Sequence, residues 1–238
     1  MKTIIHKADT RGYADHGWLK SYHTFSFASY HDPKRMNFGM LRVLNDDIVQ
    51  PKMGFGTHPH QNMEIISIPL NGALSHKDNM GNKRAIEVGE VQVMSAGTGL
   101  THSEFNDSKT DEVNFLQLWI IPEKMNIEPN YDQRKFSKEE RINTLQTVVA
   151  PKNKLEENAL PINQQAYIYR TTLELGNSIE LKLKDKNNGL YIFVEDGEVK
   201  VEGNVLSKRD AFGISDFENV TMKAEKNSKV IIIEVPMQ

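Results

Sequence analysis

Two short segments carry side chains whose types and spacing suit metal coordination. In "THPHQNME", His58 and His60 stand two positions apart, and in "GTGLTHSEFN", His102 and Glu104 repeat that spacing. Because side chains at positions i and i+2 of a strand point to the same face, each pair can deliver two donors to one interior. Imidazoles and a carboxylate, without thiolate, suit Fe(II), Mn, Ni, Co, Cu or Zn, and such a set leaves coordination positions open for chemistry.

Two further residues could contribute to this site in more than one role. Strict alternation would place Glu64, four positions after His60, on the same face as a fifth ligand, an orienting partner of an imidazole or a general base. Pro59 lacks an N–H and favours an edge, a bulge or a strand entry, so a bulge there could turn Glu64 away. His76, in "LSHKDN", lies either near the cavity or on an ordinary strand.

The aromatic-rich segment "HTFSFASY" and its neighbours have a simpler interpretation. Trp18, Phe25 and Phe27 could line a pocket, but packing on a barrel is the default for such residues. Four other histidines are expected to be structural or exposed: His6, His16, His23 and His31.

The composition excludes several classes of site. The 238 residues include no cysteine, which removes disulfides, thiolate nucleophiles and zinc–thiolate or iron–sulfur centres. A net charge of -3 gives no broad electrostatic footprint for nucleic acid, so direct binding to nucleic acid is not expected, while a protein partner is left open. The start "MKTIIHKADTRG" has no apolar h-region, and apolar runs such as "VIIIEV" are too short to span a bilayer. We therefore expect a cytoplasmic protein without membrane contact.

Short β-rich runs separated by turn residues predict an all-β protein. Runs such as "MEIISIPL", "NFLQLWII" and "KVIIIEV" have strand composition, whereas the best helical piece is "SKEERINTL", with Ser137 and Glu140 at capping-box spacing. The polar stretch around that piece suggests a connection between two domains. We therefore divide the chain into an N-terminal domain (1–136) with the metal site, a connecting segment (137–165) and a C-terminal domain (166–238) without one.

An internal repeat supports this division. Residues 65–97 can be laid over residues 190–215, with a turn glycine, Gly72 or Gly197, after the first strand of each copy. All eight histidines fall within residues 6–102. If the two halves are copies of one barrel, one metal binds in the first, and the second serves as scaffold and cavity wall.

Several motifs of the N-terminal half occur together in one known family. They are "GFGTHPHQNMEII", "SHKDNMGN", "MSAGTGLTHSEFN" and, upstream, "DHGWLKSYHTFSFASYHDP" and "LRVLNDD". This combination, over about residues 9–136, resembles the pirin family of the cupin superfamily. His102 lies further beyond Gly97 than the general cupin motif allows, and Ser95 stands where many cupins have proline. Both departures match pirins.

The resemblance implies a bicupin, in which two jelly-roll β-barrels with few short helices pack face to face around a single metal, usually iron, in the N-terminal barrel. By matching position, the pirin ligands fall on His58, His60, His102 and Glu104. The generic cupin pattern would use Glu64 instead, but Glu104 shares one strand with His102 and needs no register change. We expect Glu104 as the carboxylate ligand and Glu64 as a nearby orienting or proton-accepting group.

Three functions fit such a site. Bacterial members of the family are assigned as quercetin 2,3-dioxygenases, which implies a metal-dependent enzyme that cleaves a flavonol-like small molecule with O2, with Glu104 or Glu64 removing a hydroxyl proton. The alternatives are a metal-responsive regulatory protein, as is proposed for some eukaryotic pirins, and a non-redox metal enzyme such as an isomerase or hydrolase. We favour the dioxygenase, with Fe(II) as the expected ion, because an open coordination sphere suits chemistry.

Overall fold

Extended strands make up most of the chain. The computed structural model describes residues 1–237, and its helical elements in that range are three single turns of 3-10 helix, η1 (Ala8–Thr10), η2 (Glu139–Arg141) and η3 (Lys152–Lys154). The prediction of an all-β protein is confirmed. No helix in this range is long and apolar enough to cross a membrane.

The first half of the chain builds one large and one small antiparallel sheet. In spatial order, the large sheet contains β12 (Asn130–Lys135), β9 (Glu90–Ser95), β6 (Glu64–Asn71), β11 (Val113–Ile120), β4 (Leu41–Val49), β3 (Leu19–His23) and β2 (Gly12–Asp15). The small sheet contains β5 (Gly54–His60), β10 (Leu100–Asn106), β7 (Ala73–Asp78) and β8 (Lys83–Glu87).

The second half repeats this plan. Its large sheet runs β1 (Lys2–His6), β20 (Ala211–Ser215), β17 (Asn188–Asp196), β22 (Ser228–Pro236), β15 (Tyr167–Leu173), β13 (Gln146–Pro151) and β14 (Leu160–Ile162). Its small sheet runs β16 (Ser178–Leu181), β21 (Val220–Ala224), β18 (Glu198–Val201) and β19 (Asn204–Ser207). The β13–β14 pair is parallel, and the other pairs are antiparallel.

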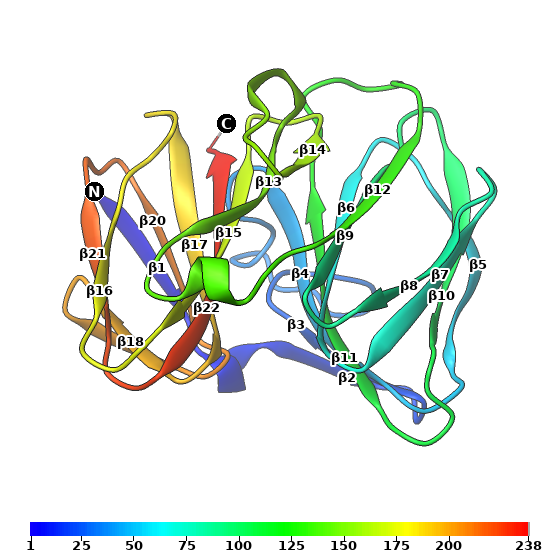
Figure 1. Cartoon of the computed structure of the whole chain (residues 1–238), viewed down its shortest axis with the longest axis horizontal. Helices are drawn as coiled ribbons and strands as arrows, with labels where there is room; N and C mark the ends of the chain where they lie inside the picture. The colour runs from blue at the N-terminus through cyan, green and yellow to red at the C-terminus, as the bar shows by residue number, and fades with distance from the viewer. Residues whose placement is uncertain (238) are drawn as a thin grey trace.

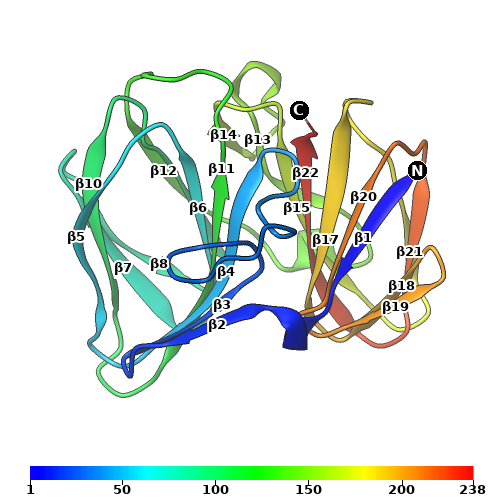
Figure 2. The same cartoon turned by 180° about the vertical axis from the view of Figure 1, so that it is seen from behind.

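The two large sheets face each other in the middle of the molecule (Figures 1 and 2). Alternation along β11 sends Leu116 and Leu118 to that interface and Phe115 and Gln117 to the opposite face. The interface side chains join those of β22, such as Ile231, in one buried apolar cluster. Burial of a large aliphatic side chain stabilises a fold by about 1.5–3 kcal/mol, so this shared cluster binds the two halves together.

The interiors of the two halves differ in chemistry. Between the sheets of the second half, apolar side chains form one continuous cluster that includes Tyr169, Ile192 and Phe212. The first half has only two smaller apolar clusters, one around Phe115 and one around Met94. The remaining interior of the first half contains a cavity lined by both aromatic and polar side chains, so a site has room there.

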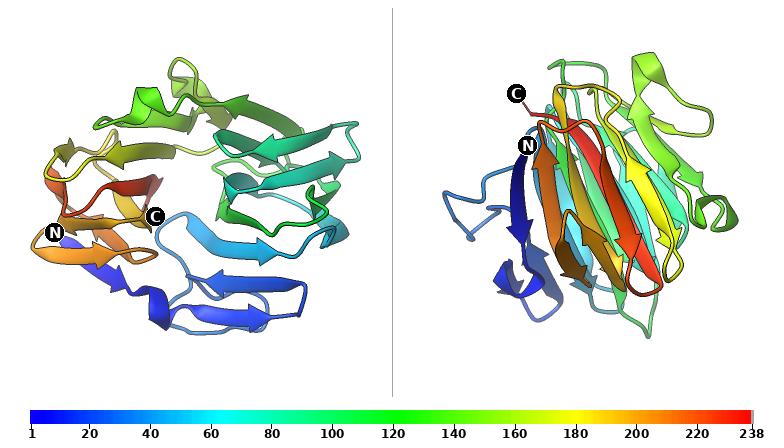
Figure 3. Two further views of the ribbon diagram at one scale, coloured as in Figure 1. Left: turned by 60° about the horizontal axis from the view of Figure 1, so that its bottom comes forward. Right: turned by 90° about the vertical axis from the view of Figure 1, so that its left-hand side faces the viewer.

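Two segments outside the predicted C-terminal domain, residues 166–238, pair with its strands. β1, at the start of the predicted N-terminal domain, pairs with β20 of the second half (Figure 3). β13 and β14 fall within the predicted connecting segment, residues 137–165, but pair within the large sheet of the second half. Both additions cover strands that would otherwise expose unpaired backbone groups at a sheet edge.

The predicted helix at Ser137 is reduced to the single turn η2. Ser137 Oγ accepts a hydrogen bond from the Glu139 backbone N–H at 3.2 Å, but Lys138 stands at the N-cap position and Glu140 accepts a hydrogen bond from Gln146 at 2.9 Å, so the predicted capping box does not form. The turn ends at Arg141, and Asn143 then adopts a left-handed conformation with a φ of 55° that leads the chain into β13. The predicted capping box is therefore wrong, and residues 142–145 form an irregular connection to β13 in place of further helical turns.

Candidate metal centre

Three imidazoles converge from two neighbouring strands of the small sheet. β5 carries His58 and His60, β10 carries His102, and the antiparallel register places His102 opposite His58. One ring nitrogen of each histidine lies within 4.8 Å of a ring nitrogen of the other two. The structure thus brings these three predicted donors to one point.

A β-bulge sets the direction of the histidines on β5. Between two successive pairs of the β5–β10 ladder, β10 has one residue and β5 has two, Gly56 and Thr57. In a regular strand, Phe55 and His58 would face opposite sides because they are three residues apart. The extra residue in β5 turns the strand, so that both side chains line the same cavity.

Glu104 lies on the same face of β10 as His102 and forms a second group of possible donors with His102 and His76. A carboxylate oxygen of Glu104 and ring nitrogens of His76 and His102 lie within 4.8 Å of one another. Ser67 Oγ donates to Oε1 of Glu104 at 3.2 Å, and Gln117 Nε2 donates to Oε2 at 3.2 Å. Both carboxylate oxygens are therefore held in a defined orientation.

Burial favours the neutral form of these groups in the absence of a cation. Burial, with a smaller contribution from neighbouring histidines, lowers the pKa of His60 to about 4 and holds the pKa of His102 far below its ordinary value. Burial raises the pKa of Glu104 to about 7, against its two hydrogen bonds. Nε2 of His60 and Nε2 of His102 are buried without a hydrogen-bond partner. Neutral imidazoles with free lone pairs are the form that binds metals, so the donor set fits a divalent transition metal.

His76 holds the imidazole proton of His102 on Nδ1. A carboxylate can only accept, so Nε2 of His76 donates to Oδ2 of Asp78 at 3.2 Å. Burial lowers the pKa of His76, and the Nδ1 of the neutral ring is then an acceptor. That nitrogen lies 3.4 Å from Nδ1 of His102, which carries the proton between them. The Nε2 lone pair of His102 is left free for a cation.

Glu64 lies away from the predicted donors. It begins β6, in the large sheet, and its carboxylate accepts hydrogen bonds from Ser95 Oγ at 2.7 Å and from the Asn163 backbone N–H at 3.2 Å. The left-handed conformation of Asn62, with a φ of 52°, breaks the strand alternation between β5 and β6. Ser67 on β6 then faces the cavity side, and Glu64, three residues earlier, faces the second half.

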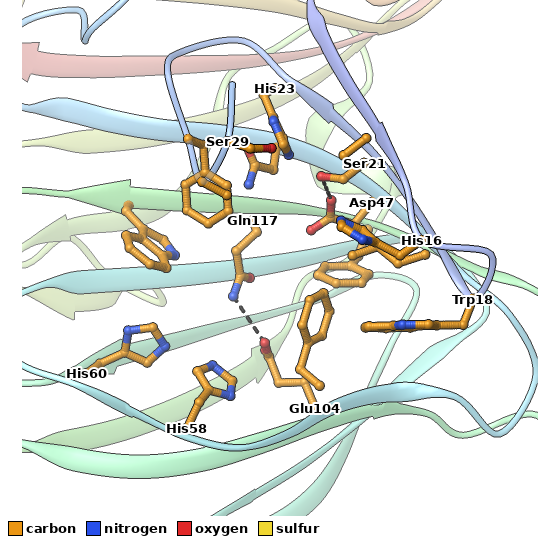
Figure 4. Close-up of a pocket in the computed structure, with 18 residues that line it drawn as sticks. His16, Trp18, Ser21, His23, Ser29, Asp47, His58, His60, Glu104 and Gln117 are labelled. Atoms are coloured by element: carbon orange, nitrogen blue, oxygen red, sulfur yellow. Dashed lines mark hydrogen bonds between the residues drawn. The ribbon is translucent and has the colours of Figure 1, made fainter. Parts of the chain in front are cut away.

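A cavity of about 590 Å³ opens beside the imidazoles (Figure 4). Its aromatic lining consists of Trp18, Phe27, Phe55, Phe115 and Trp119, in addition to histidine rings. The segment "HTFSFASY" therefore contributes Phe27 to the cavity, whereas Phe25 packs in the core against His6 and Tyr191.

The cavity also has a polar wall that the sequence reasoning missed. Ser21 on β3 donates a hydrogen bond to Asp47 on β4, and His23 lies opposite Asn45 on the same two strands. Burial raises the pKa of Asp47 to about 7, against the hydrogen bond from Ser21. The available signal was the recurrence of polar residues at alternate positions of two strands that are otherwise largely apolar. His23 had been expected to be structural or exposed.

Comparison with known proteins places the chain among proteins with related sequences and structures. The family model described as Pirin matches residues 5–120, and the model described as Quercetinase C-terminal cupin domain matches residues 147–235. The quercetin 2,3-dioxygenase of Escherichia coli is 40% identical over 232 residues, which cover 98% of each chain. The chain belongs to the pirin family.

Other pirins extend the similarity to the whole fold. A pirin-like protein of Caulobacter vibrioides is 39% identical over 226 residues, which cover 95% of this chain and 96% of the relative. The crystal structure of the bacterial pirin YhhW from Escherichia coli in complex with nickel(II) matches with a TM-score of 0.92 and 39% identity, over 99% of both chains.

Proposed function

We propose that this pirin binds one divalent transition metal through His58, His60, His102 and Glu104. The observation that carries the proposal is the convergence of three imidazoles, two of which have a buried Nε2 without a partner, beside a carboxylate fixed on both oxygens. The nickel(II) complex of a related pirin supports a metal at this fold, and Fe(II) is the ion that we expect. Glu64 is not part of this set, because its carboxylate is engaged at the interface between the halves.

We also propose that each pair of sheets forms a cupin-type jelly-roll barrel, which makes the protein a bicupin. The matches to a pirin model and to a cupin-domain model in separate parts of the chain support this assignment. In this arrangement, the first barrel holds the metal, and the apolar interior of the second leaves it a structural role.

We infer that the reaction is the cleavage of a flavonol-like substrate by O2, as in quercetin 2,3-dioxygenases. The names of related proteins support the reaction class, and the aromatic cavity supports a flat ring system as substrate. When bound, the metal would polarise a chelating hydroxyl and support electron transfer to O2. Both oxygen atoms would enter the product, and one ring carbon would leave as carbon monoxide.

The side chains of this chain would bind the substrate and move its proton. The carboxylate of Glu104, which is fixed beside the imidazoles, would accept the proton of the substrate hydroxyl and return it to the product. Gln117 and Ser67 hold the carboxylate in one orientation for that exchange. Trp119 and Phe115 would cover the ring faces and exclude water.

Metal analysis of anaerobically purified protein, followed by turnover of quercetin with that metal restored, tests the proposal. We expect about one metal ion per chain and one carbon monoxide per quercetin consumed, and we expect His102→Ala to lose both. If the metal-loaded protein consumes no flavonol, the proposed reaction is wrong but the metal site stands. If the chain binds no metal, the proposed metal site is wrong as well.

A further inference from the structure

One row of polar side chains crosses six of the seven strands in the large sheet of the first half. Cross-strand pairing connects six residues on six consecutive strands: Gln133, Gln92, Ser67, Gln117, Asn45 and His23. All six are buried. Burial of a polar side chain is unfavourable unless it gains hydrogen bonds, so each part of this row needs a partner.

The middle of the row and its β12 end have such partners, except at Gln92, whose Nε2 and Oε1 are buried without a partner and away from the cavity. Gln117 donates to the carboxylate of Glu104, and Ser67 Oγ, which has one proton to donate, lies 3.2 Å from Oε1 of Glu104 and 2.6 Å from Oε1 of Gln117. At the β12 end, Gln133 donates to the backbone carbonyl of Ala85 at 2.8 Å. Ser67, Gln117 and Gln133 therefore have hydrogen-bond partners within the protein.

The two residues at the β3 end of the row line the cavity. Nδ1 of His23 and Oδ1 of Asn45 are buried without a partner. The neighbouring pair on the same strands, Ser21 and Asp47, lines it too. In Figure 4, His23, Ser21 and Asp47 lie on the side of the cavity away from His58 and His60.

The wall between these two polar regions is aromatic. Phe115 is the direct cross-strand neighbour of Asp47, and Trp119 packs edge-on against His60 with ring centroids 5.0 Å apart. Phe27, opposite, packs edge-on against both Trp119 and His23. A ligand that satisfies the whole cavity therefore has a flat apolar body and polar groups at both ends.

We propose that His23 and Asn45 bind a hydroxyl group of the substrate at the end remote from the metal-binding group, with Ser21 and Asp47 beside them. The substrate class is then a flat aromatic compound with a chelating group at one end and a phenolic hydroxyl at the other. The identity of the chelating end rests on the proposed function, whereas the remote hydroxyl site rests on the polar side chains that line this end of the cavity: Ser21, His23, Asn45 and Asp47.

A comparison of two probes tests this site by binding. Quercetin has hydroxyls on all its rings, and 3-hydroxyflavone keeps the chelating hydroxyl–ketone but lacks the others. Their dissociation constants are measured by absorbance titration of Ni(II)-loaded protein without O2. Wild type should bind quercetin about ten-fold more tightly than 3-hydroxyflavone, because a site built for a hydroxyl is left unsatisfied without one. Asn45→Leu should abolish this preference and leave the affinity for 3-hydroxyflavone within about two-fold of wild type.

Gln92→Leu is the matched control, because Gln92 belongs to the same buried row and does not line the cavity. It should keep the ten-fold preference of wild type. His23→Phe, which retains a ring beside Phe27, is the second variant if Asn45→Leu does not fold. If the preference persists in the cavity variant, or is lost in Gln92→Leu, the remote hydroxyl site is wrong while the proposed function stands.

If neither probe binds, the proposed flavonol function is refuted. A measurement on metal-free protein then tests the remote hydroxyl site separately. Phenol is added to metal-free protein with ¹⁵N-labelled histidine, and the ring resonances of His23 are followed by NMR. A shift of His23 in wild type that is missing in Asn45→Leu supports the hydroxyl site. No shift in wild type refutes it.

Discussion

Because they are buried, the proposed metal ligands favour their neutral forms when no cation is bound and favour a divalent ion when one is available. Without a cation, the fold favours neutral imidazoles at His60 and His102 and a protonated carboxyl at Glu104. A divalent ion would replace the proton on Glu104 and satisfy the free Nε2 atoms of the two histidines. The same side chains should therefore destabilise the metal-free protein at alkaline pH and stabilise the loaded one.

Substitution of Glu104 by glutamine separates these two effects. The pKa of Glu104 is raised from 4.5 to about 7, so the folded protein binds this proton more tightly than the unfolded chain does. The resulting stability is present below about pH 4.5 and is lost as pH rises through 7. At pH 8, metal-free Glu104→Gln should be roughly 1–3 kcal/mol more stable than wild type, and at pH 4.5 this difference should vanish.

Urea denaturation of both metal-free proteins at the two pH values measures this difference. Added Ni(II) should raise the stability of wild type but not that of Glu104→Gln, because the variant lacks the anionic ligand. Equal stabilisation of both proteins by Ni(II) would remove Glu104 from the ligand set.

His76 is expected to act through His102. His76→Phe keeps a ring against Tyr131, 4.7 Å away between centroids, but removes the acceptor that fixes the His102 proton on Nδ1. Affinity for Ni(II), measured by calorimetric titration of metal-free protein, should fall about 10- to 100-fold. The ¹⁵N resonances of His102 should show a mixture of tautomers in the variant. His31→Phe, at an exposed histidine, is the control, and an unchanged tautomer in His76→Phe would contradict this role.

At the level of elements, the bulge in β5 decides which side chains reach the cavity. Gly54, at the start of β5, is closely packed, since a Cβ there would lie 2.2 Å from the carbonyl oxygen of Glu104. Gly56, in the bulge, has no atom within 4 Å of a Cβ position. The start of the strand is therefore fixed, and the bulge has room to adjust.

Deletion of Gly56 should leave the histidines of β5 aimed into the cavity. Without the extra residue, Phe55 and His58 are two positions apart, so a regular strand sends both side chains to one face. Because the packing at Gly54 fixes the start of the strand, we expect Ni(II) binding to be retained, as measured by calorimetry. Deletion of both Gly56 and Thr57 makes Phe55 and His58 neighbours, so it should turn His58 to the outer face and abolish Ni(II) binding. Full Ni(II) affinity in the double deletion would show that strand alternation does not aim the histidines.

The sequence allowed prediction of the features that depend on local spacing. Strand composition and the i, i+2 pairs around His58 and His102 gave the all-β class and the converging imidazoles. The position of Glu64 could not be predicted, because it depends on the left-handed turn at Asn62 and on a change of sheet. The polar row through Asn45 was equally inaccessible, since it exists only in the register between strands distant in sequence.

At the level of the whole molecule, the two halves share structure that neither can supply alone. β1 leaves the first half and pairs with β20, where His6 Nδ1 and the Tyr191 hydroxyl are 2.7 Å apart. Asp46 on β4 accepts hydrogen bonds from Arg11 and forms an ion pair with Arg209 of the second half at 3.1 Å. The apolar cluster between the large sheets draws side chains from both halves. The fold of the first half therefore depends on a surface provided by the other half.

This dependence predicts that residues 1–136 fail to stay soluble without residues 137–238. Separation exposes Ile66, Leu118 and their neighbours Ile68 and Leu116, and at about 1.5–3 kcal/mol for each large aliphatic side chain, the lost burial is about 6–12 kcal/mol. That loss equals most of the stability of a typical domain. Produced separately, the fragment should aggregate; produced together, the two fragments should form a soluble complex that binds Ni(II), as measured by size-exclusion chromatography and metal analysis. Ile231→Asp in the second fragment, on the shared face, should abolish the rescue. A soluble monomer of residues 1–136 with full Ni(II) affinity would show that the first half is independent.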